Sequence, residues 1–218
     1  MHDDIEPVVF VVNGNEDVRK SLRQLVKSAK LKVQTYNSPQ DFLYAYNPAQ
    51  PGCLVLDAVM PGMSGLDFQY RLLADGIRIP VIFVANHCDV STAVKAMKVG
   101  AVDFIKKPVD ISILLDSIQK AFRLDARVRR EQSVKADIMA KISLLTPRER
   151  EVMDLLVSGK SNKMIAHQLR VTRKTVDFHQ ANILKKMGVD SVVRLLLLTQ
   201  RAQADSERRQ DTKRSCSC

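Results

Sequence analysis

The sequence of 218 residues contains no tryptophan, and aromatic residues make up only 5% of it. It has no apolar run that approaches the roughly 18 residues needed to span a bilayer. Its first residues, MHDDIEP, are acidic rather than basic, which argues against a secretory signal peptide. We therefore expect a cytoplasmic protein that has no membrane partner.

Cysteine is also scarce in this chain. The four cysteines are Cys53, Cys88, Cys216 and Cys218, and no pair shows the spacing of a metal site. A reduced chain without a disulfide framework is the simplest interpretation. The last two cysteines lie in a polar tail, and the pattern assigns them no role.

Charged residues are plentiful, but their signs are unevenly distributed. Residues 1–124 contain 14 Lys and Arg against 13 Asp and Glu, a net charge of +1. Residues 125–218 contain 20 against 11, a net charge of +9. A basic half of this kind favours an anionic partner such as nucleic acid. On composition alone, a solvated basic face is the alternative.

Short apolar runs alternate with segments of helical periodicity through the first 124 residues. The predicted strands are residues 8–12, 31–36, 53–57, 80–85 and 102–105. Continuous apolar strands with helices between them are typical of a parallel sheet that is covered on both faces. We predict a five-stranded, doubly wound α/β domain of the flavodoxin-like type over residues 1–124.

The predicted strands end in residues that carry a recognisable pattern. The segments LVLDAVMPGMSG and AMKVGAVDFIKKP resemble the receiver domain of bacterial two-component response regulators. The resemblance implies that Asp57 is the phospho-acceptor candidate and that Lys107 contacts the phosphoryl group. It also places Phe104 at the aromatic switch position of that family.

This sequence departs from the receiver pattern at three pocket positions. Asn13 and Gly14 stand where the family has an acidic pair, and Ala85 stands where it has Ser or Thr. Carboxylates hold the Mg²⁺ that neutralises charge during phosphoryl transfer. We therefore expect an atypical receiver with no metal site or cofactor and with impaired or absent phosphorylation. The alternative is weak Mg²⁺ binding through Asp57 and Asn13.

The second half begins with a charged segment, LDARVRREQSVKADIMAKI, at residues 125–143. It contains no Gly or Pro and has good helix propensity, so we predict a helical linker. Its apolar stripe is too thin for a coiled coil.

Helix caps follow one another through residues 144–202. Residues 146–149, TPRE, form a capping box with proline at the first helical position, and Ser161, Thr172 and Asp190 can cap three further helices. The segments LTPREREV, SGKSNKMIA and TRKTVDFHQANILKKMGV resemble the LuxR-type helix-turn-helix of FixJ/NarL-type response regulators. We predict an all-α domain of four helices, followed by a disordered tail at residues 203–218.

The resemblance implies that residues 172–187 enter the major groove of double-stranded DNA. Asp177 is suited to accept from a cytosine amino group, and Phe178 to pack on a thymine methyl group. Basic side chains suit phosphates. The predicted DNA-binding residues are Lys163, Arg173, Lys174, Thr175, Asp177, Phe178, Ala181, Asn182 and Lys185.

These patterns predict a sequence-specific DNA-binding transcription regulator that acts as a homodimer. Its control would come from dimerisation or from a partner protein. One alternative is a conventional phosphorelay regulator that a histidine kinase activates at Asp57. Another is a protein-interaction module that does not bind DNA. An enzyme is not expected, because the sequence shows no nucleophile–base set and no nucleotide-binding loop.

Overall fold

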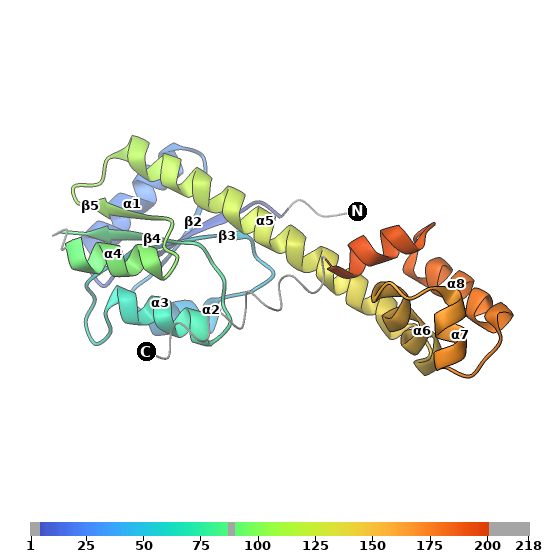
Figure 1. Ribbon diagram of the computed structural model, residues 1–218. Helices are drawn as coiled ribbons and strands as arrows, with labels where there is room; N and C mark the ends of the chain where they lie inside the picture. The colour runs from blue at the N-terminus through green and yellow to red at the C-terminus, as the bar shows by residue number, and fades with distance from the viewer. Residues whose placement is uncertain (1–4, 87–89, 201–218) are drawn as a thin grey trace. The chain divides into compact units, whose positions relative to one another are not determined.

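A computed structural model describes residues 5–86 and 90–200 of the chain (Figure 1). The chain divides into two compact units, Met1–Arg129 and Arg130–Cys218. The predictions for the tail, and those for Cys88, Cys216 and Cys218, lie outside the described residues.

The first unit is built on a five-stranded sheet with the strand order β2-β1-β3-β4-β5. All neighbouring strands are parallel, as predicted. The strands are β1 (Val8–Val12), β2 (Lys32–Tyr36), β3 (Gly52–Asp57), β4 (Val81–Ala85) and β5 (Asp103–Lys106). Every residue of β1, β3 and β4 is buried, which explains their uninterrupted apolar sequences.

Helices cover both faces of this sheet (Figure 1). The helices of the unit are α1 (Glu16–Ser28), α2 (Pro39–Ala45), α3 (Gly65–Ala74), α4 (Val90–Lys98) and the first part of α5 (Ile111–Ser143). Leu22 of α1 and Ile118 of α5 belong to one buried cluster. Phe42 of α2, Phe68 of α3 and Ala96 of α4 belong to the other. The sheet therefore separates two apolar cores.

Side-chain caps determine where several of these helices begin. The side chain of Asn15 accepts the N–H groups of Asp17 and Val18, at 2.9 and 3.2 Å, and so caps α1. Ser38 caps α2 in a similar way, since its side chain accepts the N–H of Asp41. Such a cap satisfies backbone donors that have no partner within the helix.

A buried ion pair ties α5 to the segment that leads into β3. Asp125 accepts the N–H of Gly52 at 3.0 Å and Nε of Arg129 at 2.7 Å. The guanidinium of Arg129 also donates to the carbonyl oxygens of Pro48 and Gln50. These contacts satisfy the charge of a carboxylate that is only 3% exposed.

Cys53 is a free thiol in the middle of this packing. It lies in β3 and is completely buried. Burial raises the pKa of the Cys53 thiol, with a further contribution from the charge of Asp125. A thiol in this environment stays protonated and unreactive.

The second unit is helical. It contains α6 (Pro147–Val157), α7 (Asn162–Gln168), α8 (Arg173–Met187), a helical segment at residues 192–200 and the last turns of α5. The predicted linker is helical throughout and continues α5, which has 33 residues. Ile138 of α5 is only 2% exposed and packs in the core of this unit with Ile165, Val176 and Ile183. None of the described helices is long and apolar enough to cross a membrane.

One detail differs from the sequence predictions. Asp190 does not cap the last helix. Ser191 does, since its Oγ accepts the N–H of Arg194 at 3.3 Å, while the Asp190 carboxylate pairs with the Arg194 guanidinium at 2.9 Å.

Gly65 provides a test of the packing around Asp57. A Cβ atom at Gly65 would lie 2.3 Å from the carbonyl oxygen of Asp57, so α3 and the end of β3 would have to separate. At Gly76 φ is +75° and nothing lies within 4 Å of such an atom. We expect Gly76→Ala to cost about 1–2 kcal/mol, the strain of a left-handed residue. Gly65→Ala should cost clearly more in urea unfolding of the receiver unit, and equal losses would contradict this packing.

Candidate functional site

The carboxyl edge of the parallel sheet gathers the predicted receiver residues. Asn13 follows β1, Asp57 ends β3, Ala85 ends β4 and Lys107 follows β5. Asn13 is 1% exposed and Asp57 is 7% exposed. Residues far apart in the sequence therefore form one largely buried polar cluster.

The Asp57 carboxylate has a partner on each oxygen. Its Oδ2 accepts Nζ of Lys107 at 2.7 Å and Nδ2 of Asn13 at 2.5 Å. Its Oδ1 accepts the backbone N–H of Val59 at 3.2 Å. An ammonium ion and two neutral donors thus compensate the buried charge.

The orientation of the Asn13 amide is determined by its other end. Its Oδ1 accepts the N–H of Asn15 at 2.8 Å, so Nδ2 must face Asp57. Arg19 donates to the backbone carbonyl of Asn13 at 2.7 Å. The side chain therefore presents hydrogens, rather than lone pairs, to the space beside the Asp57 carboxylate.

These residues do not fit a resident Mg²⁺ ion. Mg²⁺ requires oxygen ligands in a near-octahedral arrangement, whereas Asn13 directs a nitrogen donor toward Asp57. Within residues 5–86 and 90–200, no group of three or more His, Cys, Asp and Glu side chains is placed to hold a metal. Glu16, the nearest acid in sequence, pairs instead with Lys20 at 2.8 Å on the exposed side of α1.

Ala85 and Phe104 occupy the other two predicted pocket positions. The Ala85 methyl group is buried and offers no hydroxyl. Its carbonyl oxygen accepts the N–H of Lys107 at 2.8 Å, so its backbone still helps to position the lysine. Phe104 is half-buried and stacks on Phe83, with ring centroids 5.8 Å apart.

In the second unit, α8 is the predicted recognition helix. Thr172 caps it, and the Thr175 hydroxyl lies 2.8 Å from the Thr172 hydroxyl, so both threonines take part in the first turn. Gly188 ends the helix with φ of 69°. Its inner face consists of Val176, Ile183 and Met187, all fully buried.

The opposite face of α8 is exposed. Lys174, Phe178, Ala181 and Lys185 recur at helical spacing along it. Phe178 is 63% exposed, which is unusual for so large an apolar side chain. The other predicted residues lie nearby in sequence: Lys163, Arg173 and Asp177 are exposed, and Asn182 is half-buried.

Asn162, which sequence reasoning missed, links α7 to this surface. Its Nδ2 donates to Asp177 Oδ1 and to Gln180 Oε1, each at 2.7 Å. One carboxylate oxygen of Asp177 is therefore already engaged, which leaves the other to accept from a base. The local sequence does not indicate these hydrogen bonds, because they depend on how α7 and α8 cross.

A second ion pair fixes the end of α8 against α6. Nζ of Lys186 lies 2.6 Å from Oε2 of Glu149 and 3.2 Å from the carbonyl oxygen of Leu144. The same Glu149 oxygen accepts the N–H of Thr146, which completes the predicted capping box. The hydrogen bond from Lys186, followed by that from Thr146, holds the pKa of Glu149 below its ordinary value.

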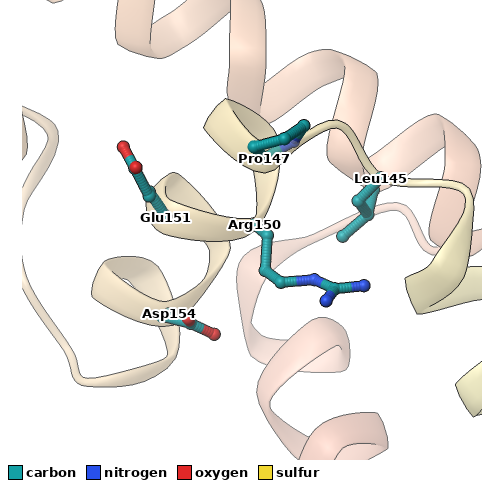
Figure 2. Close-up of a pocket in the computed structure, with 5 residues that line it drawn as sticks. All are labelled: Leu145, Pro147, Arg150, Glu151 and Asp154. Carbon is teal, nitrogen blue, oxygen red and sulfur yellow. The ribbon is translucent and has the colours of Figure 1, made fainter.

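A pocket on the second unit is lined by Leu145, Pro147, Arg150, Glu151 and Asp154 (Figure 2). Arg150 donates to the carbonyl oxygen of Ile142 at 3.1 Å, so its charge is partly used within the protein. None of the residues predicted to bind DNA lines this pocket.

Comparison with known families matches both units. The model of the response regulator receiver domain matches residues 9–119. The model of the bacterial regulatory proteins of the luxR family matches residues 143–199. The chain belongs to the FixJ-type response regulators.

Individual relatives match this chain over most of its length. FixJ of Bradyrhizobium diazoefficiens is 36% identical over 194 residues, covering 89% of this chain and 95% of FixJ. The response regulator TmoT of Ectopseudomonas mendocina is 38% identical, covering 91% and 90%. Among solved structures, the response regulator StyR is 39% identical with a TM-score of 0.79, covering 90% of this chain and 99% of StyR.

Membership identifies this response regulator as a transcription regulator of the two-component family. Its LuxR-type domain indicates DNA binding, and its receiver domain implies a kinase partner. The predicted family and fold are thereby confirmed. The comparisons do not test the roles of individual residues in the receiver pocket or on α8, and these roles stay predictions.

Two neighbouring lysines of this response regulator should respond differently to substitution. Lys185 is exposed on α8, whereas Lys186 is engaged by Glu149. If Lys185 contacts a phosphate, Lys185→Gln should reduce the slope of log affinity against log salt by about 0.9. Lys186→Gln should leave that slope unchanged and lower the unfolding temperature. A reduced slope for Lys186→Gln would show that it also binds DNA.

Acid should weaken the second unit through Glu149. Because the folded state lowers the Glu149 pKa, this residue stabilises the fold at any pH above its ordinary, unfolded pKa. That contribution is lost as the pH falls through the lower, folded value. Urea unfolding at pH 7 and in acidic steps through the Glu149 titration should show a smaller pH dependence for Lys186→Met than for the wild type. Identical profiles would rule out this coupling.

Proposed function

We propose that this regulator binds DNA without relying on Mg²⁺-dependent phosphorylation of its receiver. The observation that carries the proposal is the Asn13 amide, whose Nδ2 lies 2.5 Å from Asp57 Oδ2. A neutral donor stands where the family has a carboxylate.

The missing carboxylate affects how the negative charge that develops during phosphoryl transfer is neutralised. A bound divalent cation normally neutralises this charge and aligns the reacting groups. In this pocket, Lys107 is left as the cation that contacts Asp57, at 2.7 Å. Asp57 Oδ2 is also engaged by two donors, which lowers its reactivity as a nucleophile. Both effects disfavour transfer to Asp57.

Control then passes to association of the receiver with a second copy or another regulatory protein. By its resemblance to the family, the surface around α4, β5 and α5 is the dimer face. Ala96 of α4 is buried, whereas Val90, Val94 and Met97 are 72%, 46% and 47% exposed. This exposed apolar stripe supports a homodimer that places two recognition helices on paired half-sites.

Conventional phosphorylation by a histidine kinase is the second candidate function. The observation that favours it is the retained pair of Asp57 and Lys107, the phospho-acceptor candidate and its lysine partner. The two candidates predict opposite results with a small phosphodonor.

The test is acetyl-phosphate labelling of the freshly purified protein with Mg²⁺, read by intact mass. We expect no phosphoryl adduct on the wild type, while Asn13→Asp gains one that Asp57→Asn removes. The single substitution is preferable to a change at Gly14, where a Cβ atom would lie 3.2 Å from Pro61 Cδ. The same sample should bind duplex DNA. A wild-type adduct that Asp57→Asn abolishes would establish the conventional mechanism instead.

A further inference from the structure

Asn13 is the only asparagine of this sequence that precedes a glycine. In an Asn-Gly pair, the glycine peptide nitrogen can attack the asparagine side-chain carbonyl carbon to form a five-membered succinimide ring. Glycine favours this closure because it has no Cβ to hinder the backbone. Because the Asn13 side chain donates to Asp57, this Asn-Gly pair lies next to the phospho-acceptor candidate.

The attacking group is accessible. Gly14 is exposed, and its N–H donates to no acceptor among the residues that the structure describes. The carbonyl that it would attack is already polarised, since Asn13 Oδ1 accepts the N–H of Asn15 at 2.8 Å. A donor at this oxygen stabilises the negative charge that develops there during attack.

The leaving group also has partners. Asn13 Nδ2 departs as ammonia only after it gains a proton. It lies 2.5 Å from Asp57 Oδ2, which in turn lies 2.7 Å from the Lys107 ammonium. Asp57 can therefore relay a proton from Lys107 to the departing nitrogen, which is general acid catalysis.

We infer that Asn13 deamidates in the folded protein and so places a carboxylate beside Asp57. A bond forms between Gly14 N and Asn13 Cγ, the bond from Cγ to Nδ2 breaks, and ammonia leaves with the proton that Lys107 supplies through Asp57. The proton lost by Gly14 N passes through solvent to Lys107 and restores its charge. Water then opens the succinimide to aspartate or isoaspartate. The sequence of steps requires no oxidant or reductant.

The product changes the electrostatics of the receiver pocket. A donor hydrogen is replaced by a second negative charge beside the Asp57 carboxylate, and the two groups repel each other unless a cation lies between them. This effect of deamidation rests on the proposed function, because it concerns the same pocket. In the amide form the receiver is not phosphorylated, and in the acid form the pocket regains an oxygen that can bind a cation.

The burial of Asn13 opposes this reaction. Asn13 is 1% exposed, and burial alone would slow the reaction relative to an unfolded chain. The experiment therefore compares the native protein with the same protein in urea, at one pH and temperature. Peptide mass spectrometry follows the amide of Asn13, with the other asparagines of the chain as internal controls.

We expect the native protein to lose the Asn13 amide at least as fast as the denatured chain. Asp57→Asn should slow the native reaction about 10²-fold, the lower range for general acid–base catalysis, and leave the denatured rate unchanged. Gly14→Ala should slow both. A native protein that keeps its amide while the denatured chain loses it would overturn the inference, as would a native rate that Asp57→Asn leaves unchanged.

The regulatory consequence is tested separately with Asn13→Asp and Mg²⁺ titration. Tighter Mg²⁺ binding than in the fresh wild type supports it, and equal binding overturns it whatever the deamidation rate. The proposed function fails by a different result, namely acetyl-phosphate labelling of fresh protein in which mass spectrometry shows the Asn13 amide intact.

Discussion

A carboxylate that is buried at the end of a strand must be compensated, and this requirement organises the receiver pocket. Asp57 is 7% exposed, and its position follows from the parallel register of β3 between β1 and β4. The charge can be balanced by a cation or by hydrogen-bond donors. This chain combines a lysine with an amide, so the pocket is kept although the acidic pair of the family is absent.

The DNA-binding unit uses the same physical device for a structural purpose. Glu149 is 4% exposed, and its compensating lysine comes from α8, 37 residues later in the chain. In the receiver, the lysine that compensates Asp57 comes from 50 residues later. In each unit one buried ion pair joins segments distant in sequence. In one unit it holds the phospho-acceptor candidate Asp57, and in the other it holds the predicted recognition helix α8.

The elements of the fold could be predicted from sequence because their causes are local. The apolar sequence of Val8–Val12 indicates a buried strand, and the capping box at Thr146 indicates the start of a helix. In both cases the signal lies in residues that are adjacent in the sequence. The loss of acidic residues at Asn13 and Gly14 could also be read directly. The direction of the Asn13 amide could not, since it depends on the Asn15 N–H and on Asp57 together. The Asn162 bonds to α8 were hidden for the same reason.

The helix α5 belongs to two hydrophobic cores at once. Leu114 and Ile118 complete the receiver core, and Ile138 completes the core of the DNA-binding unit. No loop separates these roles, because one uninterrupted helix of 33 residues contains them all. A fragment cut at residue 143, where the match to the luxR family begins, would lack Ile138 and leave a cavity in this core. A DNA-binding fragment that keeps this core must therefore begin within α5, before Ile138, rather than at the end of that helix.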